Sequence, residues 1–507
     1  MCGITGVMGD SDVSHGSSLL AMLHVLEHRG RPGTLYEIAG FGALACALGT
    51  NRLPIVSPSE NRQPARSPSG RYAVVMNGEI FNYRSLASQL PIPSTAGDVA
   101  VLAAALEEWG VSRTLASLAW EGAFVAVDQS ERRLLAARDH LGIKPLYFCR
   151  HGGKTWFASE IKALRGHGGD AIVSPIEPGC VAEFRLDSPT IRHERWWAAP
   201  MRGDGERPAV DVADRVHELL RAAVRDRVPE EPYAVLLSGG VDSSLILRMA
   251  IEQNARATAY VLCTPESPDL PYARALCAEL GTPLVEVPAA SSEELACELP
   301  GVVERVESWE WQVVNHAAPM DKLFATVRAD GHKVVLTGEG ADELFFGYED
   351  PARASDNERH EAEQLVRVAD LHRTNCRRLD RMGMSHSLEC RVPFLERALT
   401  ELALSLPSKA SLSAGVNKRP LRDVAERILP PRFARRKKLS FARGAGYRYG
   451  GSDSAASVFG PTSGGDDAVP LPQAWEELPR YPSERLFLGR FLQSGYGRAD
   501  YLRRRSL

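Results

Sequence analysis

A cysteine stands at the second position of the chain, in the opening sequence MCGITG. Initiator methionines that precede small residues are usually removed, and removal would leave the thiol of Cys2 and a free α-amine on one residue. An α-amine has a pKa of about 7.7–8.0, so it can accept a proton near neutral pH. A terminal residue that uses its own amine in this way is an activated nucleophile. The dipeptide alone favours an ordinary small residue, so the rest of the chain must decide.

The sequence LLSGGVDSS at 236–244 follows a β-type apolar run and precedes a helical stretch. Its glycines allow a tight turn that directs backbone N–H groups inward, where the helix dipole favours a phosphate. The lysine of a Walker A loop is absent, and an ordinary glycine-rich turn is the alternative. The complete pattern after a β-type run favours phosphate binding. The residues expected at the phosphates are Ser238, Gly239, Gly240, Ser243 and Ser244.

Acidic residues follow another apolar run, in the sequence TGEGADELFFGY at 337–348. Ligands of open α/β sheets bind outside the carboxyl ends of the strands, so we expect Asp242 and Asp342 to face each other across a nucleotide. Magnesium takes few protein carboxylates and keeps phosphate oxygens and waters as its other ligands. The pair therefore predicts a Mg²⁺ site beside the phosphates of ATP, although Asp342 would also suit a turn or a helix cap.

The N-terminal part of the chain, up to about residue 195, has the pattern of short strands bounded by Gly, Asp or Asn. Helical segments are expected around 16–27 and 98–109, which predicts a sheet-rich α+β domain. The sequence then gains Gly, Pro and charge, and we place a linker at 198–208. The expected strands are 72–78, 122–129, 133–139, 145–150 and 155–160.

The C-terminal part, residues 209–507, alternates β-rich runs with helix-length stretches and begins with helical spacing at 212–228. This alternation predicts an α/β domain with a parallel, doubly wound sheet. Residues from about 360 to 440 have mostly helical patterns, and the Gly-rich segment 450–470 is expected on the surface. The β-rich runs are 233–238, 257–263, 282–287 and 333–338.

The composition is that of an ordinary globular protein: 507 residues, 44% hydrophobic and 24% charged. The formal net charge of −4 and the lack of a long basic block give no indication of nucleic acid as a partner. The sequence shows no apolar run of the about 18 residues that span a membrane and no signal-peptide pattern, so we expect a cytoplasmic protein. Nine cysteines without a CxxC pair favour free thiols over disulfides or zinc.

Taken in order, the motifs resemble those of glutamine-dependent asparagine synthetases over nearly the whole chain. That family joins an α+β Ntn-type class II glutaminase domain, with stacked antiparallel sheets, to an α/β ATP-pyrophosphatase synthetase domain with a parallel sheet and a helical region. The resemblance implies a glutaminase domain at 1–197 and a synthetase domain at 209–507. It rests on Cys2, NRLPIV (51–56), NGEIFNY (77–83), Asp98, ARDHLGIKPLYF (137–148), FASEIKAL (157–164), SGGVDSS (238–244), SPDL (267–270), GEGADE (338–343), ECRVPFLE (389–396) and RKKLSF (436–441).

For the glutaminase domain, the resemblance implies that Cys2 attacks the amide carbon of glutamine, releases ammonia and forms a thioester that water hydrolyses. Asn77 and Gly78 would supply the oxyanion hole, in which each donor contributes about 2.7–4 kcal/mol. A guanidinium and a carboxylate would clamp the α-carboxylate and the α-amine of the substrate. The implied glutamine-binding residues are Arg52, Asn77, Gly78, Glu79 and Asp98.

For the synthetase domain, the resemblance implies that ATP activates a carboxylate as an acyl-adenylate and releases pyrophosphate. Lys438 would neutralise the phosphates, and Glu339 would take a proton from the attacking ammonia. A sealed passage between the two sites would protect ammonia and adenylate from water. The implied ATP-binding residues are Leu237, Ser238, Gly239, Gly240, Asp242, Ser243, Ser244, Leu262, Thr337, Gly338 and Lys438, the acceptor-binding residues are Asn375 and Arg378, and the metal ligands are Asp242 and Asp342.

Two departures from the family pattern lie in the glutaminase domain. The family motif HRGPD is HRGRP here, because Arg31 and Pro32 replace a Pro–Asp pair. In the sequence GDVAV at 97–101, no glutamate follows Asp98 where the family usually has one. The first departure leads us to expect that the glutaminase loop closes differently.

A third departure concerns the acceptor. Asn375 stands where the aspartate-using enzymes carry an Asp, and an amide cannot pair with an α-ammonium as a carboxylate does. Trp309 and Trp311 are expected either to enclose a larger, more apolar acyl group or to belong to the core. These features predict that aspartate is a poor acceptor and that a larger carboxylic acid, as in the specialised metabolism of antibiotics, is a better one.

The sequence thus favours an ATP- and glutamine-dependent amidotransferase. Its partners would be glutamine, ATP and a carboxylic acid, either aspartate or a specialised metabolite, and a homodimer is left open as its assembly. One alternative is an ATP-dependent cyclase or ligase of the β-lactam synthetase kind, and another is a non-catalytic sensor of glutamine or ATP. The glutaminase residues named above argue against the first alternative, and Asp242, Glu339, Asp342 and Lys438 argue against the second.

Overall fold

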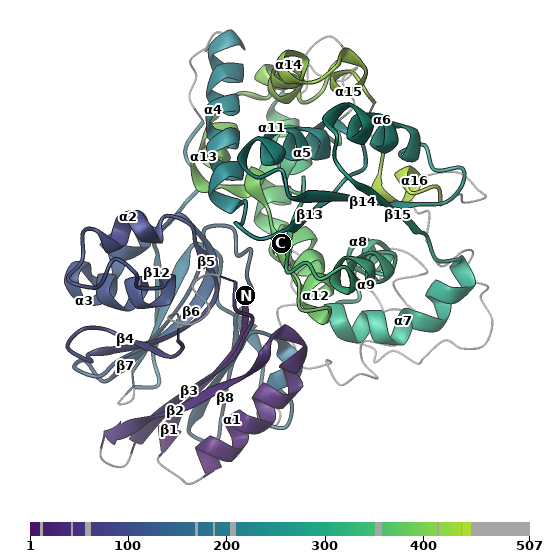
Figure 1. Cartoon of the computed structure of the whole chain (residues 1–507). Helices are drawn as coiled ribbons and strands as arrows, with labels where there is room; N and C mark the ends of the chain where they lie inside the picture. Colours follow the sequence, from purple (N-terminus) through teal and green to yellow (C-terminus); the bar gives the residue numbers. More distant parts are fainter. Residues whose placement is uncertain are drawn as a thin grey trace.

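The computed structural model describes residues 1–10, 14–41, 44–55, 62–167, 171–185, 188–202, 209–349, 357–412, 415–437 and 439–447. The chain folds into an N-terminal domain of antiparallel sheets, in purple and blue in Figure 1, and a C-terminal domain built on a parallel sheet, in teal and green. This confirms the predicted fold class. The predicted linker lies between the last strand of the first domain and the first helix of the second, and its residues 203–208 are outside the described ranges.

Two six-stranded sheets stack against each other in the N-terminal domain. Their strand orders are β10-β8-β9-β1-β3-β2 and β12-β11-β7-β6-β5-β4, and the core between them includes Ile4, Leu48, Val75 and Val125. The strands are β1 (Cys2–Asp10), β2 (Arg31–Phe41), β3 (Leu44–Arg52), β4 (Ala65–Arg66), β5 (Tyr72–Ile80), β6 (Trp120–Asp128), β7 (Arg133–Arg138), β8 (Tyr147–His151), β9 (Lys154–Ala158), β10 (Ser174–Pro175), β11 (Cys180–Arg185) and β12 (Ile191–Arg195).

Helices cover the outer faces of both sheets. The helix α1 (Ser14–Val25) packs on β1 and β3, while α3 (Asp98–Ser117) lies on the other sheet against β5 and α2 (Tyr83–Ala87) packs on α3. Because β5 and β6 are covered on both faces, every residue of these two strands is buried. A strand that is covered on both faces has a nearly continuous apolar sequence, as both of these have.

The C-terminal domain is built on a five-stranded sheet with the order β15-β14-β13-β16-β17, in which all neighbouring strands are parallel. Its strands are β13 (Tyr233–Leu236), β14 (Ala257–Cys263), β15 (Leu284–Pro288), β16 (Val334–Leu336) and β17 (Glu389–Arg391). Its helices are α4 (Ala209–Arg227), α5 (Val241–Gln253), α6 (Leu270–Leu280), α7 (Ser292–Val306), α8 (Trp311–Ala317), α9 (Met320–Ala329), α10 (Ala341–Leu344), α11 (Asn357–Asp370), α12 (Asn375–Ser385), α13 (Arg397–Ser405), α14 (Arg419–Ile428), α15 (Pro431–Ala434) and α16 (Phe441–Gly444).

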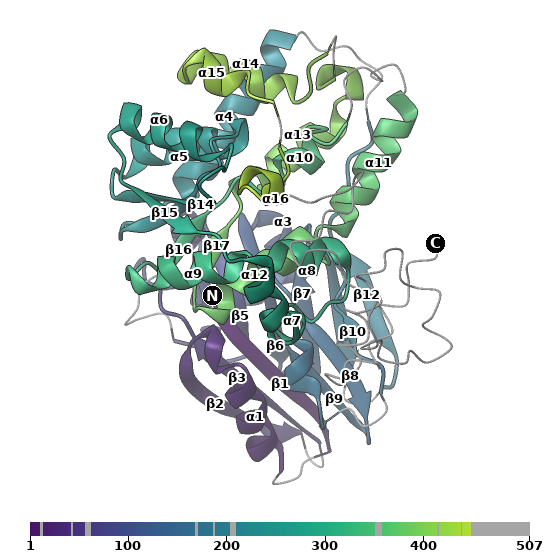
Figure 2. The same ribbon diagram turned by 90° about the vertical axis from the view of Figure 1, so that its right-hand side faces the viewer.

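The helix α12 lies at the boundary between the domains, close to the N-terminus of the chain, in both Figure 1 and Figure 2. It contacts α8 and β17 of its own domain and the short 3₁₀ helix η1 (Glu27–Arg29) of the other. None of the helices within the described ranges is long and apolar enough to cross a membrane. All nine cysteines fall within those ranges, and there they are free, as the sequence predicted.

Candidate active sites

Cys2 begins β1 at the centre of its sheet, directly opposite Arg52 of β3. The residue is only 4% exposed, and burial raises the pKa of its thiol. The main-chain nitrogen of Cys2 donates a hydrogen bond of 3.2 Å to Oδ1 of Asn77, in the middle of β5. The two stacked sheets thus bring three of the predicted glutamine-site residues together at the start of the chain.

Met1 lies inside the same region. Its α-ammonium donates to Oε2 of Glu389 in the other domain at 2.7 Å, and its side chain packs against Leu53 and Met384. Burial by itself lowers the pKa of this amine, but Glu389 and other nearby acidic groups outweigh it and raise the pKa. Removal of Met1 would therefore place the free amine on Cys2 and open a space beside the thiol.

Asn77 presents a free donor at this site. Its Oδ1 accepts from Cys2 and, at 3.5 Å, from Nη2 of Arg29, so both acceptor positions of that oxygen are used. Its Nδ2 is buried and has no hydrogen-bond partner among the described residues. An amide N–H that is fixed beside the nucleophile suits an oxyanion hole. The geometry supports the role predicted for Asn77.

Gly78 occupies a position that excludes a side chain. Its φ is +142°, and a Cβ would lie 2.0 Å from the carbonyl oxygen of Glu121 in β6. We expect Gly78→Ala to lower the free energy of unfolding by about 2–5 kcal/mol, because backbone strain adds to overpacking. The same change should reduce glutamine hydrolysis, since it displaces the predicted oxyanion donor. Denaturant unfolding and a glutaminase assay measure the two effects.

Gly70 offers the matched control for that variant. It also has a positive φ, +81°, but a Cβ there would meet nothing within 4 Å. Gly70→Ala should cost only the strain, about 1 kcal/mol, and should leave glutaminase activity unchanged. Equal losses of stability in the two variants would contradict the importance of the contact with Glu121.

Buried carboxylates surround the predicted α-amine pocket. Burial, together with the charges of Asp98 and Glu389, raises the pKa of Glu79 well above its usual value. Asp98 is held in place because its carboxylate accepts from the backbone nitrogens of Ile80 and Val99, at 3.2 and 2.9 Å. An ammonium group bound between these acids would stabilise their charged forms. This electrostatic environment fits the α-amine of glutamine.

Two side chains near Cys2 were missed by the sequence analysis. Nε2 of Gln63 lies 3.5 Å from Sγ of Cys2, while Oε1 of Gln63 accepts from the backbone nitrogen of Met76 at 2.8 Å. Nε of Arg29 donates to the carbonyl oxygen of Cys2 at 3.2 Å. Gln63 belongs to no motif, whereas Arg29 could have been noticed inside the HRG sequence.

The second site is a cavity of about 430 Å³ at the carboxyl ends of β13 and β16, lined by both predicted loops. Gly239 has a φ of +68°, and a Cβ there would lie 2.5 Å from Cβ of Tyr272, so the turn needs a glycine. The two loops pack closely, since a Cβ on Gly338 would be 3.0 Å from the nitrogen of Ser243. Of the predicted ATP contacts, the cavity is lined by Leu237, Ser238, Asp242, Ser243, Leu262, Thr337 and Gly338 but not by Gly239, Gly240 or Ser244, and Lys438 lies outside the described residues.

Asp242 and Asp342 face each other across the ammonium of Lys418. Nζ of Lys418 is 2.6 Å from Oδ2 of Asp242 and 2.5 Å from Oδ1 of Asp342. Oδ1 of Asp242 is buried and has no hydrogen-bond partner in the described part of the chain. Two carboxylates at the mouth of a phosphate loop suit a hard cation, so the pair fits Mg²⁺. Lys418 was not predicted, because it belongs to none of the motifs recognised in the sequence.

The predicted acceptor residues contact the acidic loop directly. Nδ2 of Asn375 donates to Oε1 of Glu343 at 2.8 Å, and Nη2 of Arg378 donates to Oε1 of Glu339 at 2.5 Å. The hydroxyl of Tyr348 donates to the same oxygen of Glu343 at 2.8 Å. Burial and two neighbouring carboxylates raise the pKa of Glu343 to about 7. A carboxylate therefore stands directly behind the amide of Asn375.

Of the tryptophans at 309 and 311, the structure describes the side chain of Trp309, which does not enclose this end of the cavity. Trp309 is 1% exposed, belongs to the main hydrophobic core and does not line the cavity, so of the two alternatives left open by the sequence it takes the core position. The side chain of Trp311 lies outside the described part of the structure. The lining at this end is polar and charged instead, with Gln312, Arg367, Asp370, Thr374 and Arg378.

Comparison with known families finds a match for each of the two domains. A model described as a glutamine amidotransferase domain matches residues 1–186, and a model described as asparagine synthase matches residues 215–365 and 352–458. The two matches cover both folded domains in the expected order. The chain belongs to the asparagine synthetase family. It is therefore an enzyme, an amidotransferase in which a glutaminase domain is joined to an ATP-using synthetase domain.

The curated relatives within this family match along most of their length. A glutamine-hydrolyzing asparagine synthetase of Triphysaria versicolor is 29% identical over 477 residues, which are 89% of this chain and 79% of that protein. The glutamine-hydrolyzing asparagine synthetase 3 of Arabidopsis thaliana is 28% identical, over 89% of this chain and 80% of that protein. Among solved structures, a glutamine PRPP amidotransferase from B. subtilis covers 66% of this chain and 81% of its own at 17% identity, and its TM-score of 0.34 adds nothing to the assignment.

Proposed function

We propose that this chain hydrolyses glutamine at Cys2 and passes the ammonia to an acyl-adenylate formed from ATP and a carboxylic acid. The products are glutamate, an amide, AMP and pyrophosphate. The observation that carries the proposal is that one chain contains both sites that the reaction needs. The first is the buried thiol of Cys2 near the amide of Asn77, and the second is the cavity at the phosphate loop, lined by Asp242 and Asp342. The names of the relatives support the same reaction.

In the glutaminase domain, Sγ of Cys2 attacks the side-chain amide carbon of glutamine. The amine of Cys2, freed by removal of Met1, takes the thiol proton and returns it to the departing ammonia. Nδ2 of Asn77 and the backbone nitrogen of Gly78 donate to the developing oxyanion. Water then hydrolyses the thioester and releases glutamate. Arg52, opposite Cys2, binds the α-carboxylate, and the acidic pair of Glu79 and Asp98 binds the α-ammonium.

In the synthetase domain, backbone N–H groups at the start of α5 hold the β- and γ-phosphates of ATP. The acceptor carboxylate attacks the α-phosphorus, and pyrophosphate leaves toward Lys418. Asp242 and Asp342 would hold Mg²⁺, which neutralises phosphate charge when it is bound. Arg378 occupies only Oε1 of Glu339, so Oε2 of Glu339 remains to take a proton from the attacking ammonia.

For the acceptor, we propose an amino acid with charged groups, of which aspartate is the simplest. The polar lining residues Gln312 and Thr374 support this choice, as does Glu343, which supplies a carboxylate where the sequence showed only Asn375. A larger carboxylic acid without an α-amine, the expectation from the sequence, is the second candidate and rests on Asn375.

Aspartate and succinate test this choice because they differ only by the α-amine. We expect kcat/KM for pyrophosphate release to be about 10- to 100-fold higher with aspartate, the effect of one charge-assisted hydrogen bond. The measurement uses saturating ATP and ammonia, so the glutaminase site plays no part. A succinate value equal to or above that of aspartate would support the second candidate and would assign Glu343 no role in binding an ammonium.

The overall function is tested by following glutamate and pyrophosphate together, with amide-labelled glutamine, ATP, Mg²⁺ and a panel of carboxylic acids. We expect the label to appear in a new amide in proportion to pyrophosphate. Pyrophosphate without consumption of glutamine would indicate the cyclase or ligase alternative. Binding of glutamine or ATP without either product would indicate a sensor.

A further inference from the structure

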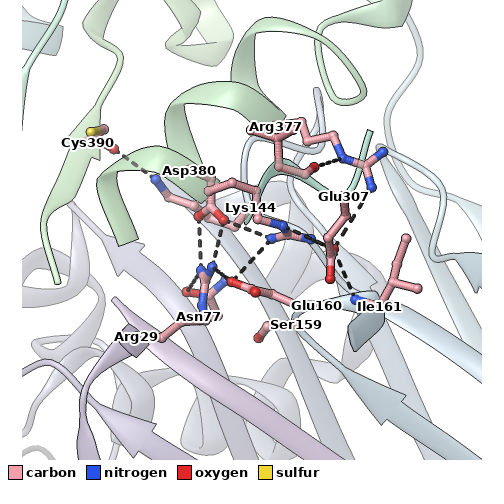
Figure 3. Close-up of polar contacts among 12 residues, drawn as sticks. Arg29, Asn77, Lys144, Ser159, Glu160, Ile161, Glu307, Arg377, Asp380 and Cys390 are labelled. Carbon is pink, nitrogen blue, oxygen red and sulfur yellow. Dashed lines mark hydrogen bonds and ion pairs between the residues drawn. The ribbon is translucent and has the colours of Figure 1, made fainter. Parts of the chain in front are cut away.

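A buried group of charged side chains joins the two domains (Figure 3), and one of its members, Arg29, contacts the carbonyl oxygen of Cys2. At its centre, Arg29 of η1 meets Asp380 of α12, and neither side chain exposes more than 2% of its surface. Nη1 of Arg29 lies 2.8 Å from Oδ2 of Asp380, and Nη2 lies 3.0 Å from Oδ1. Two parallel hydrogen bonds of this kind fix the plane of the guanidinium as well as its position.

The other donors of the same guanidinium point at the glutaminase site. Nε donates to the carbonyl oxygen of Cys2 at 3.2 Å, Nη2 also reaches Oδ1 of Asn77 at 3.5 Å, and Nη1 also reaches Glu160 at 2.6 Å. Arginine has five N–H donors in a rigid fork, so every donor of Arg29 has a partner. The plane that Asp380 sets therefore also determines where Arg29 meets Cys2 and Asn77.

The contact between Nη2 of Arg29 and Oδ1 of Asn77 is one of two that fix which way the side-chain amide of Asn77 faces. An amide side chain can turn its oxygen and its nitrogen to either side, and only one orientation leaves the N–H group of Asn77 available to an oxyanion. The donors from Arg29 and Cys2 hold the oxygen, so the nitrogen remains buried and free among the described residues. Without the donor from Arg29, one of the two contacts that select this orientation is lost.

The carboxylates that pair with Arg29 are distant in the sequence. The family motif has an Asp three residues after the Arg that corresponds to Arg29, but this chain has Pro32 there, and Pro32 continues β2 opposite Asn51. The carboxylates that contact Arg29 come from elsewhere, namely Glu160 of the same domain and Asp380 of the other. A buried guanidinium needs such partners, because an unpaired charge in the interior is costly.

We propose that Asp380, a residue of the synthetase domain, is a positioning residue of the glutaminase site and acts through Arg29 on Asn77. The inference rests on the proposed glutaminase function of Cys2. It means that the oxyanion hole is correctly oriented only when the synthetase domain is docked. The same helix carries Asn375 and Arg378 at the acceptor end of the cavity, so α12 contacts both sites.

The test is Asp380→Asn in the full chain, assayed separately for glutamine hydrolysis and for synthesis with ammonia. We expect kcat for glutamine hydrolysis to fall about 10- to 100-fold, less than the about 10²- to 10³-fold loss on deleting an oxyanion donor. The KM for glutamine should change less than about threefold, because Arg52 and Asp98 hold the substrate. Ammonia-dependent synthesis should be retained, and it also shows that the variant is folded.

Glu307→Gln is the matched control. Glu307 belongs to the same buried charged group and also links the domains, since it accepts from the backbone nitrogens of Ile161 and Lys162 and from Arg381. It contacts neither Arg29 nor Asn77 in the described structure. The same loss of a buried charge at the same interface should therefore leave the glutaminase kcat unchanged.

Arg29→Lys tests the same contact from the other side, because lysine keeps the positive charge but cannot make the paired hydrogen bonds of a guanidinium. It should reproduce the loss of kcat, and it keeps the proposal testable if Asp380→Asn fails to fold. Combining the two substitutions should lower kcat no further than the larger single effect. The proposal is overturned if Asp380→Asn keeps the wild-type kcat, if Glu307→Gln loses as much, or if Arg29→Lys is fully active. A wild-type protein that does not hydrolyse glutamine would instead contradict the proposed function.

Discussion

Cys2→Ala is expected to abolish glutamine-dependent amide formation while ammonia-dependent synthesis continues at its normal rate. The proposed hydrolysis uses Sγ of Cys2 as its nucleophile, and the methyl group of alanine cannot replace it. The synthetase cavity is lined by other residues at the edge of a different sheet, so it should remain intact. The measurement compares amide formation with glutamine and with ammonium chloride in the same preparation.

Cys46→Ala is the control for this substitution. Cys46 lies in β3, is fully buried and belongs to the same core between the sheets as Cys2, but the proposed reaction does not use it. It should therefore retain both activities. Equal loss of the glutamine- and ammonia-dependent reactions in Cys2→Ala would contradict the division of labour between the domains.

The position of Met1 adds a condition to the same prediction. While Met1 is present, the free amine belongs to Met1 and is paired with Glu389, and the nitrogen of Cys2 is an amide. We therefore expect the mass of active protein to correspond to a chain that begins at Cys2. Full retention of Met1 together with normal glutamine hydrolysis would show that the α-amine of Cys2 is not the base.

The strands that the sequence predicted well are those with the most complete burial. The run at 72–78 is part of β5, and the runs at 122–129 and 133–139 correspond to β6 and β7. All of β5 and β6 is buried, because the other sheet of the sandwich covers one face and helices cover the opposite face, so apolar residues continue without interruption. The parallel strands β13, β14 and β16 were predictable for the same reason, whereas β15 was predicted although most of it is not fully buried, and β17 was not predicted.

The strands β1, β2 and β3 were not predicted, although β1 carries the nucleophile. Their sequences contain many small residues, including Gly3, Gly6 and Gly9 in β1, and glycine is depleted in strands. Close packing explains their presence here, since a Cβ on Gly6 would lie 3.2 Å from a methyl group of Leu48. Local sequence preferences do not contain this information, which depends on the neighbouring strand.

The residues of the candidate sites likewise include some that the sequence predicted and some that it missed. Motifs beside Gly-rich turns predicted Asp242 and Asp342, because the backbone that positions them is local, whereas Asn77 was predicted only through the resemblance to the family. Lys418 and Asp380 were missed because they reach their partners from far along the chain, 176 residues from Asp242 and 351 from Arg29. Only the packing of α14 and α12 brings these charges to the two sites, and a single sequence does not reveal it.

Asp242→Asn and Asp342→Asn are each expected to reduce pyrophosphate release at least about 10²-fold, while glutamine hydrolysis continues. Each change removes one of the two anionic ligands proposed for Mg²⁺ and leaves one carboxylate of the pair beside Lys418. The phosphates of ATP would then lack much of the positive charge that stabilises the departing pyrophosphate. The measurement is pyrophosphate release over a range of Mg²⁺ concentrations, because a lost ligand should raise the Mg²⁺ requirement.

The control for these two variants is Asp423→Asn. Asp423 lies on α14 of the same domain, outside the cavity, and its partner Arg419 is 3.7 Å away in a partly exposed ion pair. Such a pair contributes at most about 1 kcal/mol, so activity and its Mg²⁺ dependence should be unchanged. Near-normal pyrophosphate release at limiting Mg²⁺ in either cavity variant would exclude that residue as a metal ligand. Its contact with Lys418 would then be structural, since the ammonium bridges the two loops whether or not a metal binds there.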